Sequence, residues 1–337
     1  MMKEASWYEK KADKKVRGRL CAHNCLISDK KTGICGVRKN EDGMLLSLVY
    51  DKVIAEHIDP IEKKPLYHFL PGSTSYSIAT AGCNFTCLHC QNAEISQIPR
   101  NQAALTGRKR TPEAIVSAAL ASGCASISYT YTEPTIYYEL AYDTAKLAAE
   151  NGLKNVFVSN AYINPEPLAK ISPYLHAANI DLKGFSENFY HSVCGAKLQP
   201  VLDAIELYKK LGIWLEITTL VIPGLNDSPD TLKSIAAFIA STGVEIPWHV
   251  TAFHPTYLMT DKPQTPVQNL MRARSIGLSA GLRYVYTGNV SYGEGENTYC
   301  PACRTAVVER CGFRIAHYNL KNGQCLQCHA NCDGVFI

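Results

Sequence analysis

Three cysteines, Cys83, Cys87 and Cys90, stand close together at a C-x3-C-x2-C spacing. They directly follow an apolar, β-branched run at residues 75–80, so the thiols are expected together on one loop at the end of a strand. Iron–sulfur clusters favour thiolate ligands and normally take four of them. Three close thiolates without an evident fourth suggest a [4Fe-4S] cluster with one open iron, and an open position makes a metal site reactive. A zinc knuckle or a plain redox site are the alternatives, and the rest of the chain must distinguish them.

A second group of cysteines lies near the start of the chain. Cys21, Cys25 and Cys35 form a C-x3-C-x9-C pattern, with His23 between the first two. Such spacings suit a structural metal with four nitrogen or sulfur ligands, and His23 is the nearest candidate for the fourth. A reduced, packed group of thiols is the alternative interpretation.

A third group closes the chain. Two C-x2-C pairs are separated by 21 residues, with short β-type runs between them, and the four cysteines are Cys300, Cys303, Cys325 and Cys328. Paired knuckles of this kind are typical of a zinc ribbon, so the pattern predicts a structural Zn2+. Rubredoxin-like iron and an auxiliary cluster remain alternatives, and Cys311 and Cys332 are expected to take no part.

Composition narrows the class of protein. The chain has 337 residues, of which 46% are hydrophobic, enough for one large domain with small appendages. A net charge of +4 does not favour a nucleic-acid partner. Fourteen cysteines in C-x-x-C-like clusters indicate metal binding in a reducing compartment. The charged N-terminus has no apolar signal region and no run reaches 18 apolar residues, so we expect a cytoplasmic protein that does not span a membrane.

The middle of the chain alternates between strand-like and helix-like patterns. Strands are predicted at 75–80, 125–129, 155–159, 177–181, 213–221, 246–252 and 283–287. Helices are predicted at 112–122, 135–150, 165–172, 199–210, 228–241 and 266–279. This alternation predicts an α/β fold with a parallel sheet, here a partial (β/α) barrel. The expected domains are a Cys-containing N-terminal segment (1–72), the barrel core (73–290) and a zinc-ribbon-like tail (291–337).

Polar side chains follow almost every predicted strand. The cysteine loop comes after the first strand, Thr132 and Glu133 after the second, and Ser159 and Asn160 at the end of the third. Further polar residues at the later strand ends are Asp181, Lys183, His254 and Asn289. Active sites of such barrels lie at the carboxyl ends of the strands, so this pattern predicts a ligand site there.

With these residues in place, the chain resembles a known family. Residues 75–290 resemble the radical S-adenosylmethionine (SAM) superfamily, in its branch similar to pyruvate formate-lyase-activating enzyme. Nearly the whole chain is similar to the radical SAM enzyme of the AmmeMemoRadiSam system, which is named for neighbouring Memo-like and AMMECR1-like genes. The segments that carry this resemblance are 59–72, 83–92, 129–135, 180–184, 248–255 and the cysteine-rich tail.

The resemblance implies roles for individual residues. Cys83, Cys87 and Cys90 would ligate a [4Fe-4S] cluster whose open iron binds SAM, and one electron would split SAM into a 5′-deoxyadenosyl radical that takes hydrogen from a substrate. The residues implied to contact SAM are His89 (adenine), Thr132 and Glu133 (amino group), Ser159 and Asn160 (carboxylate and ribose), Lys183 (carboxylate end) and His254 (nucleoside), while Asp181 would help to bind a monovalent cation near SAM. Val158 departs from the pattern of activases, which have Asp there as part of a cation site.

The resemblance also implies partners and competing functions. A reductant such as flavodoxin or ferredoxin would supply the electron, and Memo-like and AMMECR1-like proteins are possible partners. The substrate, a small molecule or a protein, is not identified by the sequence. A glycyl-radical-enzyme activase acting on a protein backbone is the first alternative. An iron–sulfur electron carrier is the second, but it leaves Glu133, Asp181, Lys183 and His254 unexplained.

Overall fold

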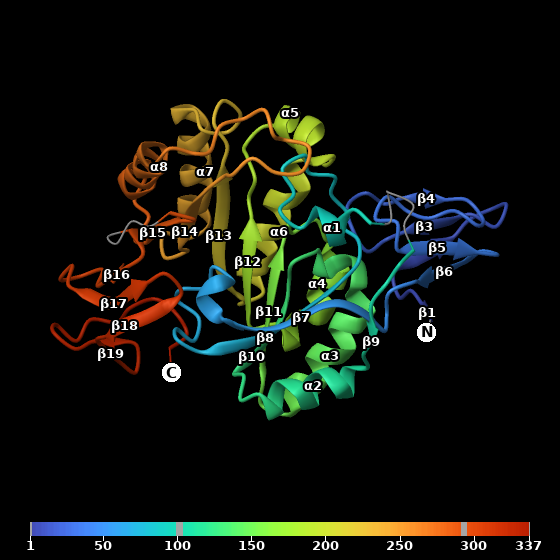
Figure 1. Cartoon of the computed structure of the whole chain (residues 1–337), viewed down its shortest axis with the longest axis horizontal. Coiled ribbons are helices and arrows are strands. Elements are labelled where there is room, and N and C mark those ends of the chain that lie inside the picture. The colour runs from blue at the N-terminus through green and yellow to red at the C-terminus, as the bar shows by residue number, and fades with distance from the viewer. Residues whose placement is uncertain (1, 99–103, 291–294, 337) are drawn as a thin grey trace.

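A computed structural model gives the structure of residues 2–98, 104–290 and 295–336. Within these residues nine strands form one mixed sheet, in the order β15-β14-β13-β12-β11-β10-β8-β7-β9 (Figure 1). The strands β8 and β10 to β15 pair in parallel, which confirms the predicted parallel sheet. The bounds of these parallel strands are Thr74–Thr80 (β8), Ser126–Tyr129 (β10), Lys154–Ser159 (β11), Ala177–Asp181 (β12), Trp214–Val221 (β13), Trp248–Ala252 (β14) and Val285–Gly288 (β15). Strands β15 and β9 are the edges, so the hydrogen-bonded sheet is open.

Helices connect the parallel strands. Their bounds are Pro112–Ala121 (α2), Tyr138–Glu150 (α3), Pro165–Ile171 (α4), Gln199–Lys210 (α6), Pro229–Thr242 (α7) and Val267–Ser279 (α8). Short turns of helix add α1 (Ala93–Ser96) and α5 (Glu187–Phe189). Helices α2 and α7 each begin with a side-chain cap. Thr111 accepts from the Ala114 amide, Ser228 accepts from the Thr231 amide, and a proline follows each cap in the first turn. Among the described helices none has the length and apolar character that a membrane span requires.

Two further strands join the sheet, and the sequence patterns did not predict them. Strand β7 (Lys52–Pro60) runs antiparallel to β8, and β9 (Arg108–Lys109) pairs with its start. Polar residues interrupt the apolar ones in β7, so its residues show no continuous hydrophobic run. After β7 the segment 61–72, which starts with a 3-10 turn (Ile61–Lys63), crosses the amino ends of β13, β14 and β15.

The N-terminal segment forms two small antiparallel sheets. Their strands are β1 (Lys3–Glu4), β6 (Met44–Ser47) and β5 (Arg38–Glu41) in one sheet, and β2 (Tyr8–Lys10), β3 (Val16–Gly18) and β4 (Leu26–Ile27) in the other. Buried Arg38 pairs with Glu139 of α3 at 2.6 Å, which fixes this segment to the core. In Figure 1 the segment lies on one side of the core and the tail on the opposite side.

The tail is a small β structure. Its strands are β16 (Thr298–Tyr299), β17 (Ala306–Cys311), β18 (Arg314–Tyr318), β19 (Leu320–Lys321) and β20 (Gln324–Cys325). Arg310 enters the core, where its guanidinium donates to the Tyr67 carbonyl at 2.8 Å and lies over the Tyr67 ring. Asp333 pairs with Arg283 at 2.9 Å. The expected domain boundary at residue 290 adjoins residues 291–294, which lie outside the described residues.

Candidate active site

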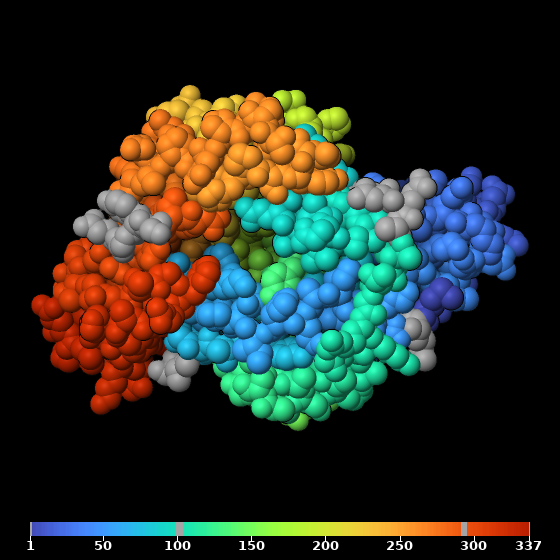
Figure 2. Space-filling view, viewed as in Figure 1, coloured from blue at the N-terminus to red at the C-terminus, as the bar shows by residue number. Residues whose placement is uncertain are grey.

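A cavity of about 490 Å³ opens at the carboxyl ends of the parallel strands. Figure 2 shows the hollow between the loops of the upper part of the molecule and the segment that contains residues 61–72. Its lining includes ten residues that the sequence proposed as site residues: Cys83, Cys87, His89, Cys90, Thr132, Glu133, Ser159, Asn160, Asp181 and Lys183. The structure thus brings together residues from four successive strand ends, because parallel strands all present their carboxyl ends at one edge.

The cysteine loop is held by backbone contacts. The Thr86 amide donates to the Cys194 carbonyl at 2.9 Å, and the Leu88 amide donates to the Val193 carbonyl at 3.0 Å. The turn at 190–194 ends at Gly195, where a Cβ would lie 2.0 Å from the Thr86 hydroxyl oxygen. Only glycine therefore allows this turn to approach the loop so closely.

Polar groups surround the three sulfur atoms. The Phe85 amide donates to Cys83 Sγ at 3.4 Å, and the Ser96 hydroxyl lies 3.1 Å from Cys90 Sγ. Burial raises the pKa of the Cys83 thiol, and a hydrogen bond with Cys194 together with burial raises that of Cys87. Bare thiolates are thus disfavoured here, and a metal centre that replaces the protons suits this donor set. Three thiols with hydrogen-bond donors beside a polar cavity fit a [4Fe-4S] cluster.

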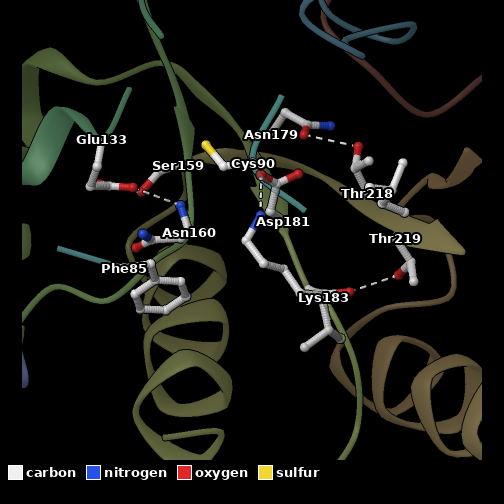
Figure 3. A network of polar contacts seen from close by, with 12 residues as sticks. Phe85, Cys90, Glu133, Ser159, Asn160, Asn179, Asp181, Lys183, Thr218 and Thr219 are labelled. Carbon is white, nitrogen blue, oxygen red and sulfur yellow. Dashed lines mark hydrogen bonds and ion pairs between the residues drawn. The ribbon is translucent and has the colours of Figure 1, made fainter. Parts of the chain in front are cut away.

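Glu133 is a buried carboxylate that organises the neighbouring strand end. Its Oε1 accepts from the Thr135 amide (3.0 Å), the Thr135 hydroxyl (2.6 Å) and the Ser159 hydroxyl (2.8 Å). Its Oε2 accepts from the Asn160 amide at 2.8 Å (Figure 3). Burial raises the pKa of Glu133 despite these donors. The residue therefore caps the 3-10 turn that precedes α3, and it also faces the cavity.

Asn160 connects Glu133 to the cysteine loop. Its side-chain amide donates to Asn84 Oδ1 at 2.8 Å and lies 3.9 Å from Cys83 Sγ. Asn84 is 1% exposed and also donates to the Tyr162 carbonyl. The sequence reasoning did not single out Asn84, although its position directly after Cys83 was a signal. This chain of hydrogen bonds fixes the cysteine loop to β11 and places amide N–H donors next to the cysteines.

Asp181 and Lys183 form an ion pair at the carboxyl end of β12. Lys183 Nζ donates to Asp181 Oδ2 at 2.9 Å (Figure 3). The Lys183 side chain is 16% exposed and the Asp181 side chain 38%. Burial lowers the pKa of Lys183, but the Asp181 carboxylate and the nearby thiols outweigh burial and raise it overall. Lys183 therefore carries a positive charge into the cavity lining.

His89 is buried beside the cysteine loop. Burial and the charge of Lys183 lower the pKa of His89 to about 3, so its ring is neutral. Within the described part of the chain, its Nδ1 atom has no hydrogen-bond partner. A neutral ring in the cavity lining suits contact with an aromatic ligand group.

The structure places other proposed residues elsewhere. His254 is exposed and does not belong to the cavity lining, so its contact with a nucleoside stays a prediction that the geometry does not support. Cys21, Cys25 and Cys35 lie around a different, smaller cavity in the N-terminal segment.

The lining of the large cavity also contains polar residues to which the sequence assigned no individual role. Asn179 Oδ1 accepts from the Thr218 hydroxyl at 2.9 Å, and both line the cavity. Lys64, which is 2% exposed, pairs with Asp59 at 2.6 Å and lies over the Tyr131 ring. Lys64 reaches this place because segment 61–72 folds across the sheet, which no local pattern indicates.

The four tail cysteines form a compact metal-type site. Cys300 Sγ lies 3.6 Å from Cys328 Sγ, and Cys303 Sγ lies 3.7 Å from Cys325 Sγ. All four sulfur atoms lie within 4.8 Å of one another, a spacing that one tetrahedral ion can bridge. Cys311 and Cys332 do not belong to this group, as expected from the sequence.

Comparisons with known proteins identify the family. The chain is 47% identical over 335 residues to "Uncharacterized protein MJ0808" of Methanocaldococcus jannaschii, an alignment that covers 98% of this chain and 99% of the relative. Residues 77–235 match the family model of the radical SAM superfamily. This stretch of the chain belongs to the radical SAM superfamily. This result confirms the superfamily that the motifs predicted, while membership of the AmmeMemoRadiSam branch stays a prediction.

A second relative and a solved structure are less similar to this chain. "Putative glycyl-radical enzyme activating enzyme MJ1632" of M. jannaschii is 23% identical over 232 residues, covering 65% of this chain and 80% of the relative. The crystal structure of a radical SAM methyltransferase from Sphaerobacter thermophilus superposes with a TM-score of 0.52 at 12% identity, covering 88% of this chain and 78% of that chain. At this identity the second similarity shows the fold alone.

Proposed function

We propose that the protein is an enzyme that binds a [4Fe-4S] cluster on Cys83, Cys87 and Cys90 and cleaves SAM reductively in the adjoining cavity. The observation that carries the proposal is that these three thiols share one cavity with a buried carboxylate, an ammonium and a neutral imidazole. SAM has a matching set of groups, since it carries an ammonium, a carboxylate and an adenine. When bound, the cluster and SAM together supply the 5′-deoxyadenosyl radical that abstracts hydrogen from the substrate.

The amino-acid end of SAM would lie between Glu133 and Lys183. Glu133 Oε1 already accepts three hydrogen bonds, whereas Oε2 accepts one, so Oε2 has the capacity to accept from an ammonium. Lys183 uses one of its three donors on Asp181, which leaves donors for a carboxylate. His89, being neutral, contacts the adenine without introducing another positive charge beside the sulfonium.

The substrate would occupy the remainder of the cavity. Asn179, Thr218, Thr251 and Asn289 supply amide and hydroxyl groups there, and Lys64 adds a cation that Asp59 partly neutralises. We therefore propose a polar substrate whose reacting part is small enough to share about 490 Å³ with SAM. A glycyl-radical-enzyme activase is the second candidate, and the printed name of the relative MJ1632 favours it. In that case a protein loop would enter the same cavity.

Three accessory proposals accompany this function. The four tail cysteines would hold one Zn2+, because their sulfur atoms have the spacing of a closed tetrahedral site. A flavodoxin or ferredoxin would supply the electron. Memo-like and AMMECR1-like proteins would be partners if the chain belongs to the AmmeMemoRadiSam branch.

The test is release of 5′-deoxyadenosine. Anaerobically reconstituted protein is mixed with SAM and dithionite, beside a Cys87→Ala variant and a matched Cys311→Ala variant, whose cysteine is exposed and outside the three groups. We expect product from the wild type and from Cys311→Ala, and none from Cys87→Ala. Wild-type protein that carries a reducible four-iron cluster but gives no product would overturn the proposal and favour an electron carrier.

A further inference from the structure

The N-terminal segment contains a second cavity, separate from the proposed active site. Its volume is about 40 Å³, roughly three times the volume that one water molecule needs. Cys21, Cys25 and Cys35 all line it, although the first two follow β3 and the third lies between β4 and β5. The other lining residues are mostly apolar, among them Leu20, Ile27 and Leu45, and the polar ones include Arg38.

Arg38 supplies an independent sign that this cavity holds an anionic group. The residue is 5% exposed and lines the cavity. Its Nη2 atom pairs with Glu139, but within the described residues its Nε and Nη1 atoms have no hydrogen-bond partner. Leaving buried guanidinium donors unpaired is costly, so such groups call for a partner that the protein atoms do not provide.

Backbone donors also point at the cysteines. The His23 amide is hydrogen-bonded to the Cys21 sulfur, and the Ile34 amide is hydrogen-bonded to the Cys25 sulfur. Amide hydrogen bonds to sulfur stabilise negative charge on thiolate ligands and tune the potential of iron–sulfur clusters. Three sulfurs, two amides and a guanidinium thus converge on one small space.

The spacing of the sulfur atoms distinguishes between kinds of metal centre. One tetrahedral zinc ion, with Zn–S distances of about 2.3 Å, places its sulfur ligands about 3.8 Å apart. Among the described residues, only the tail cysteines form a group of three or more ligand atoms that all lie within 4.8 Å. Cys21, Cys25 and Cys35 are more widely spread, as are Cys83, Cys87 and Cys90. In a cluster each thiolate binds a different iron atom, so wider spacing is expected.

We infer that Cys21, Cys25 and Cys35 bind a second iron–sulfur cluster of the four-iron class, with Arg38 as its counter-charge. Three protein ligands leave one iron for a non-cysteine ligand. The cluster would lie against the SAM-cluster loop. His23 Nε2 lies 2.8 Å from the Asn84 carbonyl oxygen, and a Cβ on Gly82 would lie 3.0 Å from the Cys35 carbonyl oxygen. This inference does not depend on the proposed reaction.

The test is iron and sulfide analysis of full-length protein reconstituted anaerobically with iron and sulfide. We expect about eight iron and eight sulfide per chain for the wild type and for the control Cys311→Ser, since each cubane holds four of each. A triple variant with Ala at Cys83, Cys87 and Cys90 should keep about half of both. Its reduced electron paramagnetic resonance signal should not respond to SAM.

The converse variant completes the test. Replacing Cys21, Cys25 and Cys35 by Ser should also halve iron and sulfide, while the remaining signal still changes when SAM is added. The variant that lacks all six cysteines should contain no sulfide, because the tail site binds a single ion. The inference is wrong if the Cys83/Cys87/Cys90 variant contains no sulfide, or if its N-terminal cysteines bind zinc. That variant leaves the N-terminal cysteines intact, so it decides the question even if the converse variant fails to fold.

Discussion

Replacing Glu133 by Gln tests the most specific contact that the structure suggests. The change keeps the shape of the side chain but replaces one carboxylate oxygen by an NH2 group. Three donors face Oε1 and one faces Oε2, so the NH2 group will take the position of Oε2, where it displaces only the Asn160 amide. That is also the position with room to accept from the SAM ammonium, so the ligand would meet a donor instead of an acceptor.

The expected loss of SAM affinity follows from this orientation. Removing one partner of a buried, hydrogen-bonded charge pair costs about 2–5 kcal/mol. Affinity should therefore fall by about 30-fold or more. The effect on folding should be smaller. Losing one hydrogen bond to a charged acceptor costs about 1.5–3 kcal/mol, and relief from burying a carboxylate whose pKa is already raised offsets part of it.

The assay is anaerobic titration of SAM into cluster-loaded protein. Binding is measured by calorimetry and by the change in the electron paramagnetic resonance signal of the reduced cluster. The control is Glu150→Gln, at an exposed carboxylate at the end of α3. We expect the control to bind as the wild type does. If Glu133→Gln binds SAM within about threefold of the wild type, less than 1 kcal/mol, the reasoning is refuted and Glu133 only caps the turn.

Three further predictions concern the framework around the site. Burial lowers the pKa of His68 to about 4, so the folded state binds its proton less well than the unfolded state; the resulting stability is complete above about pH 6.5 and falls on acidification towards pH 4. We therefore expect the free energy of unfolding in urea, taken as wild type minus His68→Gln, to be about 2 kcal/mol smaller at about pH 5 than at about pH 7. The same value at both pH values would contradict this prediction. Cys300→Ser should remove about one zinc per chain and lower the melting temperature, as metal analysis and thermal unfolding will show; normal zinc content would argue against the tail site. Gly82→Ala should reduce cluster loading, because its φ is +102° and a Cβ would lie 2.8 Å from a valine methyl group, whereas Gly123→Ala, with φ +67° and nothing within 4 Å, should load normally by iron analysis. Equal loading of both variants would show that this contact does not hold the loop.

Much of the core architecture could be predicted from the sequence alone. The parallel strands and the main helices lie within a few residues of the patterns that predicted them, because hydrophobic periodicity and helix caps are local properties. The cysteine spacings and the polar residues at strand ends are also local. Parallel pairing then brings those strand ends together, so ten of the proposed site residues meet at one cavity.

Tertiary structure decided what depends on contacts between distant residues. Strand β7 obtains its conformation by pairing with β8, and the segment 61–72 that follows it brings Lys64 into the cavity lining. The fold leaves His254 exposed and outside the cavity lining although its motif matches. Arg38 meets the N-terminal cysteines only because β5 packs beside them. Sequence spacing determines which groups can bind a metal, but only folding determines which distant charges surround it and how far apart its ligands lie.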